Sequence, residues 1–169
     1  MVTSRPRADD RSGVCERRAA LMVVGVSHFE RFFREAADLD VDKSDLKRYE
    51  SFVRDKIADL LTIAEARAKA DDRDVIEPRD LPITKGLQES IHRFRKMDVA
   101  AEVRPMLVEI STRPELDLGV VDEVDDRLPE VAGGLSLALG QSFHLIDTNV
   151  HNPATVQWER AIQVFDLLL

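Results

Sequence analysis

The spacing of one arginine and one aspartate limits the folds open to this chain more than any other feature. Arg73 precedes Asp80 by seven residues, and the β-branched residues Val75 and Ile76 lie between them. A guanidinium can donate two parallel hydrogen bonds to a carboxylate, so such a pair can tie a loop to the start of the next helix. We therefore expect Arg73 and Asp80 to form a structural ion pair, which we call the clamp.

Two helices are expected before the clamp. Apolar residues recur at helical intervals over residues 27–39, where a serine and a glutamate have the spacing of a capping box. A loop follows, in which Asp42 or Ser44 can accept hydrogen bonds from the free amides of the next helix. This long helix is expected over residues 44–70, and its wide apolar stripe predicts neighbours on more than one side.

The segment after the clamp arginine contains two prolines that leave the start of its helix open. Val75 and Ile76 suit a brief extended contact, and Pro78 fits the first turn of a helix. Pro82 would interrupt such a helix, because it lacks the amide proton that an intrahelical bond needs. Either residues 78–81 form a separate turn and the main helix begins at Pro82, or the helix is bent there.

A short helix, a long helix and a short helix, with the clamp at the second junction, resemble the histone fold over residues 27–97. In that family an arginine at the end of the second loop pairs with an aspartate near the start of the third helix, and Arg73 and Asp80 match these positions. DNA-binding histones carry a lysine and a threonine after that arginine, whereas Asp74 and Val75 stand here. Aspartates also surround the arginine, which favours an internal ion pair over a phosphate contact.

The second half of the chain, residues 98–169, can be read as a degenerate copy of the same unit. We expect a short helix with Pro105 near its first turn, then a loop, then a second long helix that opens with Leu128-Pro129. A final helix is expected from Pro153 or Ala154. Three glycines of the second long helix, Gly133, Gly134 and Gly140, permit close approach of another helix, as a crossing of the two long helices requires.

Two such units in one chain can bury each other's apolar faces and form a pseudo-dimer. The clamp has no counterpart in the second unit, where Val150, His151, Asn152 and Gln157 occupy comparable positions.

Two further stretches resemble a bacterial family. The strings Asp80–Leu87 and Trp158–Leu169 are similar to the histone-fold doublets catalogued as domain of unknown function 1931, and we extend the resemblance over residues 22–169. It implies an all-α, histone-like fold of two helix–long helix–helix units, residues 27–97 and 98–169, in one compact domain. Members of that family carry no assigned activity, so the resemblance implies no substrate.

Composition favours a helical, globular protein. The chain has 169 residues, of which 44% are hydrophobic, and residues that favour strands are scarce. The one cysteine, Cys15, excludes an internal disulfide, and no apolar run is long enough to span a bilayer. We expect a cytoplasmic protein, with residues 1–21 as a disordered or loosely ordered tail.

The charge of the chain limits nucleic-acid binding. The formal net charge is −8, and residues 98–169 contain four basic and 13 acidic residues, so this half should repel phosphate backbones. Acidic neighbours also offset the basic residues at the start of the first long helix. The residues that can contact DNA are Lys43, Lys47, Arg48 and Arg79, together with the arginines of the tail.

The sequence contains no recognisable motif for catalysis or metal binding. The four histidines are scattered and lack zinc-ligand spacing. The acidic residues between Asp117 and Asp126 lack the oxygen spacing and central glycine of a calcium loop, and a solvated loop is expected there. No phosphate loop or nucleophile elbow is found. We therefore expect no catalytic residues, no metal and no cofactor.

Three hypotheses for function follow. The favoured one is a non-enzymatic interaction module that assembles with itself or with another protein. The alternative is an architectural DNA-binding protein, whose affinity should fall steeply with added salt. The third, a small-molecule binder or enzyme with a pocket between the units, is supported by no motif.

Overall fold

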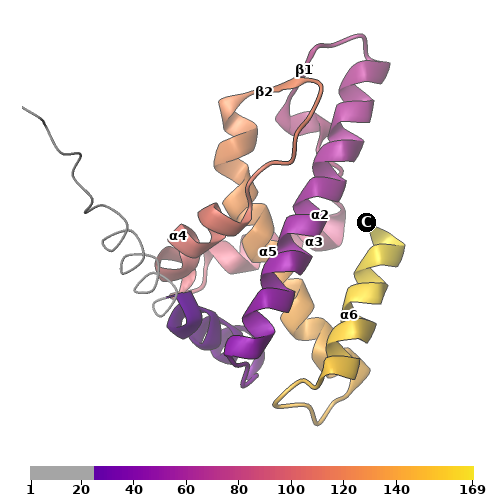
Figure 1. The fold of residues 1–169 in the computed structure, drawn as a ribbon. Coiled ribbons are helices and arrows are strands. Elements are labelled where there is room, and N and C mark those ends of the chain that lie inside the picture. Colours follow the sequence, from indigo (N-terminus) through magenta and orange to yellow (C-terminus); the bar gives the residue numbers. More distant parts are fainter. Residues whose placement is uncertain (1–24) are drawn as a thin grey trace, which may run out of the picture.

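Helices make up most of the part of the chain that the structure describes. The structure is a computed structural model, and it describes residues 25–169 (Figure 1). The predicted helical character is confirmed, whereas the predicted tail and Cys15 lie outside the described residues. A first helix covers residues 25–37, and the elements after it are α2 (Lys43–Ala70), β1 (Val75–Ile76), the 3-10 helix η1 (Pro78–Asp80), α3 (Lys85–Arg95), α4 (Ala100–Ile110), β2 (Gly119–Val120), α5 (Asp122–Ile146) and α6 (Thr155–Leu168).

The long helix α2 begins where a capping box closes at Asp42. The Asp42 carboxylate accepts the amide of Ser44 at 2.6 Å, and the Asp45 carboxylate accepts the amide of Asp42 at 3.2 Å. Of the two capping residues expected from the sequence, Asp42 is therefore the one that caps the helix. At its other end the helix stops at Ala70, and Asp72 beyond it takes a positive φ of 54°, a conformation that ends helical backbone.

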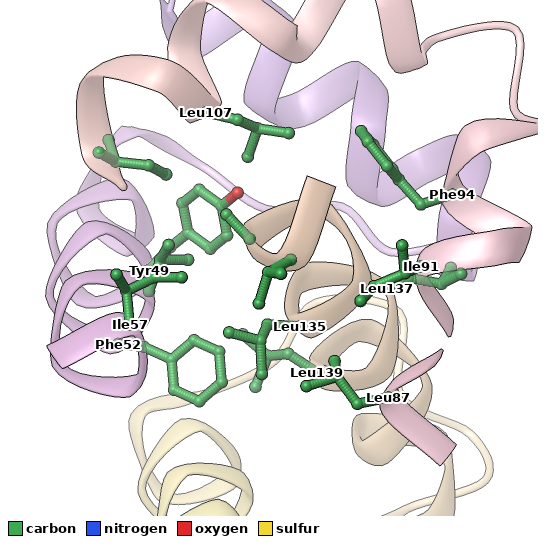
Figure 2. Close-up of a cluster of buried hydrophobic side chains, with 14 of the residues drawn as sticks. Tyr49, Phe52, Ile57, Leu87, Ile91, Phe94, Leu107, Leu135, Leu137 and Leu139 are labelled. Carbon is green, nitrogen blue, oxygen red and sulfur yellow. The ribbon is translucent and has the colours of Figure 1, made fainter. Parts of the chain in front are cut away.

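The second half repeats the order short helix, long helix, short helix with α4, α5 and α6. The two long helices, α2 with 28 residues and α5 with 25, meet through a buried hydrogen bond of 2.9 Å between Tyr49 and Ser136. Figure 2 shows α5 in the middle of the core, with Tyr49 and Phe52 of α2 on one side and Ile91 and Phe94 of α3 on the other. One hydrophobic core therefore includes side chains from both halves.

Extended segments join the two halves near both ends of α2. Beyond its C-terminal end, β1 pairs in parallel with β2 (Figure 1). Before its N-terminal end, the amide of Asp40 donates to the carbonyl of His151 at 2.6 Å. The extended contact expected at Val75 and Ile76 is confirmed. The expectation of a strictly all-α chain is wrong, because β1 finds a strand partner in β2 and the fold is mostly helical with a small sheet.

The main helix after the clamp starts later than the prolines indicated. Residues Pro78–Asp80 form a separate turn, η1, which was one of the two alternatives, but α3 begins at Lys85 instead of Pro82. Thr84 caps α3, because its hydroxyl oxygen accepts the amide of Leu87 at 3.3 Å.

Two helices run through prolines that the sequence placed at or near their starts. The start of α5 is Asp122, six residues before the expected Leu128-Pro129, and α4 begins at Ala100, so that Pro105 lies inside it. Three acidic residues occupy the first turn of α5, where negative charge is favourable because the amides at a helix start are partly positive. The acidic stretch expected to be a loop is therefore partly helical.

The glycines of α5 allow close approach of α3 and of the first helix. A Cβ atom at Gly134 would lie 2.5 Å from Cγ1 of Ile91, and one at Gly140 would lie 3.0 Å from Cβ of Ala37. The predicted role of these glycines in helix approach is confirmed. The partner expected for them, the other long helix, is wrong.

Candidate functional site

The clamp joins the loop after α2 to η1. Arg73 Nη1 donates to Asp80 Oδ2 at 2.8 Å, and Arg73 Nη2 donates to Asp80 Oδ1 at 2.5 Å. The same carboxylate accepts the amide of Glu77 at 2.8 Å, and the carbonyl of Asp80 accepts from Arg67 Nη1 at 3.2 Å. These contacts fix η1 to the preceding loop and to the last turns of α2.

Burial and charge keep both members of the clamp ionised. Asp80 is 3% exposed, yet hydrogen bonds from Arg73 outweigh the effect of burial and lower the pKa of Asp80 to about 2. Hydrogen bonds to Asp80 and Asp71 in turn raise the pKa of Arg73 above its usual range. Within the described residues, Arg73 Nε is buried without a hydrogen-bond partner. The guanidinium is thus directed into the protein and not toward a phosphate.

Gln157 takes the place of Asp80 at the start of α6. Its Oε1 accepts the amide of Ala154 at 2.6 Å, and its Nε2 donates to Asp147 at 3.0 Å. Val150, which precedes Gln157 by seven residues, is 4% exposed and stands where an arginine would be needed. The second unit therefore keeps the contact that caps the helix and lacks the ion pair.

Three of the basic residues considered for DNA contact lie at the start of α2. Lys43 and Lys47 are exposed there. Arg48 binds Oδ1 of Asp45 at 3.3 Å and Oγ1 of Thr155 at 2.9 Å, so it links α2 to α6. The two lysines are the members of this group that remain open to a ligand.

Arg79, the fourth of these residues, lies near the opposite end of α2. It is exposed and pairs with Glu77 at 2.7 Å, on a turn that is bonded to Arg67. Twenty helical residues separate Lys47 from Arg67, which is about 30 Å of helix. The structure therefore does not bring Arg79 together with Lys43 and Lys47.

A groove that the sequence analysis missed lies between η1, α3 and the first half of α5. It has a volume of about 980 Å³. The sequence held one sign of it, because residues 85–96 contain four basic residues and one acidic residue in a chain of net charge −8. The charged residues that line the groove are Arg79, Lys85, Arg93, Arg95 and Arg127, with the acidic residues Glu89 and Glu130.

Apolar side chains are exposed toward the C-terminal end of α6. Val164, Leu167 and Leu168 are 43%, 85% and 73% exposed. Their spacing of three and four residues puts them on one side of the helix. We call these three residues the α6 surface.

The histidines and acidic residues do not assemble into a metal site in residues 25–169, where no three side chains of His, Cys, Asp or Glu are placed to hold an ion. His92 and His151 are exposed, whereas His28 and His144 are half-buried. In the same part of the chain, none of the helices combines the length and apolar character that crossing a bilayer needs.

Comparison with known proteins gives one family. Its profile, described as Domain of unknown function (DUF1931), matches residues 29–166. The chain belongs to this family. A DUF1931-like structure is that of a protein from Thermus thermophilus, which is 50% identical, with a TM-score of 0.76 and coverage of 85% of this chain and 97% of that one. A crystal structure from Aquifex aeolicus is 26% identical, with a TM-score of 0.76 and coverage of 86% and 95%.

A further relative, an uncharacterised protein of Aquifex aeolicus (strain VF5), is 29% identical over 113 residues. These residues are 67% of this chain and 66% of the relative, so the chain spans about two thirds of the length of that protein. The resemblance to the DUF1931 family found in the sequence is thus confirmed, and the names of these relatives state no activity.

Proposed function

We propose that this DUF1931 protein is a histone-fold doublet in which both units belong to one domain. Each half has the order helix, long helix, helix, and the two long helices meet at Tyr49 and Ser136. Loops of one half pair with loops of the other near both ends of α2, through the β1–β2 sheet and the Asp40–His151 hydrogen bond. This arrangement supports two similar units that face each other about an approximate two-fold axis.

We infer that the doublet acts as a non-enzymatic assembly module, and the α6 surface is the observation that carries this proposal. Leu167 is 85% exposed and Leu168 is 73% exposed on the same side of one helix as Val164. Clustered apolar side chains on a protein surface mark interaction sites more often than isolated ones do. Burial of these side chains against a partner would be favourable because it removes apolar area from water.

The ionisable groups with shifted pKa values support a structural role. Burial alone would lower the pKa of Lys56, but its hydrogen bonds to Asp166 and Asp59 raise it overall. The hydrogen bond from Lys69 to Asp117, at 2.7 Å, raises the pKa of the lysine and lowers that of the aspartate. Such groups gather in a cleft at many catalytic sites, whereas these hold helices and loops together outside the groove.

The partner that we propose is a second copy of this chain. An apolar surface is complementary to itself, as an isologous contact between identical subunits requires. The nearby charges are largely neutralised, because Lys56 Nζ lies 2.7 Å from Asp59 Oδ2 and 2.8 Å from Asp166 Oδ1. Two α6 surfaces can therefore approach each other without strong repulsion from this cluster.

Sedimentation velocity of the wild type and of Leu167→Asp tests this proposal. The wild type is expected to form a dimer as its concentration rises, and Leu167→Asp is expected to stay monomeric. Leu145→Asp is the matched control, because Leu145 is 87% exposed but lies on α5, so this variant should dimerise like the wild type. A wild type that stays monomeric at every concentration overturns self-association and favours a different protein as partner.

Architectural DNA binding is the alternative, and the exposed Lys43 and Lys47 are the observation in its favour. Phosphate neutralisation by these lysines predicts an affinity that falls steeply with added salt. A titration with duplex DNA that detects no binding at low salt removes this alternative. For the compartment we propose the cytoplasm, because a single cysteine allows no disulfide within the chain.

A further inference from the structure

The groove between η1, α3 and α5 concentrates positive charge on an acidic protein. Five of its lining residues are basic and two are acidic, whereas the whole chain has a net charge of −8. Its apolar lining includes Leu81, Ile91 and Val131, which are 5%, 8% and 4% exposed. A ligand in the groove would therefore meet cationic side chains around an apolar and nearly closed floor.

Two arginines of the groove have no carboxylate partner in the described part of the chain. Arg93 donates to the neutral side chain of Gln141 at 2.8 Å, and Arg127 is exposed without an ion pair. Arg95 differs, because its Nε donates to Glu130 at 2.9 Å. The guanidinium groups of Arg93 and Arg127 thus keep their charge and most of their donors for a ligand.

We infer that this groove binds a compact ligand that carries a phosphate or diphosphate group. The planar fork of an arginine donates two parallel hydrogen bonds to phosphate oxygens, and it does so better than a lysine. The cationic lining contains four arginines and one lysine. This inference goes beyond the proposed assembly role and does not depend on it.

A compact ligand fits the groove better than a continuous nucleic-acid backbone does. Four acidic residues between Asp122 and Asp126 precede Arg127 on α5, and Glu89 and Glu130 lie in the groove itself. A long polyanion would have to pass these carboxylates, which would repel its phosphates. The volume of about 980 Å³ is within the range of pockets for small molecules.

Titration of the full chain with inorganic pyrophosphate tests the inference. Calorimetry gives the affinity, and NMR of the backbone amides and arginine Nε–H groups locates the site, with shifts expected on α3 and around Arg127. The double variant Arg93→Gln/Arg127→Gln should bind about tenfold more weakly, because it loses the two guanidinium groups without carboxylate partners. The double variant Arg54→Gln/Arg160→Gln removes equal charge from exposed positions on α2 and α6 and should bind like the wild type.

Two outcomes would overturn the site itself. One is the absence of pyrophosphate binding by a wild type that is folded by circular dichroism. The other is equal weakening by both double variants, because this would reflect net charge instead of a defined groove. The proposed ligand class would be wrong if duplex DNA displaced pyrophosphate from the same residues with a steep dependence on salt.

Discussion

Arg73 and Asp80 contact each other at two points, from Nη1 to Oδ2 at 2.8 Å and from Nη2 to Oδ1 at 2.5 Å. The Asp80 side chain is 4% exposed and the Arg73 side chain 17% exposed. Because η1 leads into α3, this pair links the loop after α2 to the helix that packs against the glycines of α5. One ion pair in the first unit thus helps to set the contact between the two halves.

Removal of either side of the clamp should destabilise the protein, and the two losses should not add. Asp80→Ala is expected to lower the free energy of unfolding by about 2 kcal/mol, because the remaining arginine can still reach water. Arg73→Ala should cost more, since it leaves a nearly buried carboxylate without its countercharge. Urea unfolding of both single variants and the double variant measures the coupling. Arg79→Ala, which removes an exposed pair with Glu77, is the control, and additive losses at Arg73 and Asp80 would contradict the link.

The clamp also predicts a loss of stability in acid. The pKa of Asp80 is about 2 in the folded protein and 3.8 in its ordinary range, so the folded state binds this proton less tightly than the unfolded state does. The contribution of Asp80 is therefore present above about pH 4 and is lost as the pH falls through 2. The difference in unfolding free energy between the wild type and Asp80→Asn should shrink below pH 4. A difference that stays constant from pH 7 to 2 would rule out this coupling.

Elements set by neighbouring residues could be predicted from the sequence. The long helix α2 begins one residue before the expected Ser44 and ends at the expected Ala70, because its cap and its unbroken apolar stripe lie within one segment. The extended contact at Val75 and Ile76 was likewise visible in two adjacent β-branched residues. In these cases the local preference and the final fold agree.

Elements that depend on distant segments could not be predicted in the same way. The two residues of β2 are too few to show alternation, and they become a strand because β1 lies beside them. A proline often marks a helix start, but Pro129 lies inside α5, whose start is set by acidic residues at Asp122 and beyond. The groove combines residues 78–95 with residues 127–131, so no single stretch of sequence contains it.

The close contact between α3 and α5 predicts that Gly134→Ala destabilises the protein by about 1–3 kcal/mol. The added Cβ would lie 2.5 Å from Cγ1 and 2.9 Å from the backbone nitrogen of Ile91, so the backbone of α3 would have to move. A gain in helix propensity of up to about 1 kcal/mol is too small to offset this cost. Gly86→Ala is the control, because no atom lies within 4 Å of its Cβ, and thermal unfolding should show it equal to or slightly more stable than the wild type. Equal stability of Gly134→Ala and the wild type would contradict the described spacing.

The hydrogen bond between the two long helices predicts unequal costs for removal of its two ends. Ser136 Oγ donates its one proton to the carbonyl of Ala132 at 2.6 Å, so the Tyr49 hydroxyl is the donor in the 2.9 Å contact with Ser136. Tyr49→Phe should cost about 1 kcal/mol, because Ser136 keeps its bond to Ala132. Ser136→Ala should cost more, up to about 3 kcal/mol, because Tyr49 is 0% exposed and its hydroxyl would lose its acceptor. Urea unfolding of both variants and of the double variant measures these costs. The double variant should be no less stable than Ser136→Ala alone, since it removes the stranded hydroxyl, and equal costs for the two single changes would show that water reaches this contact.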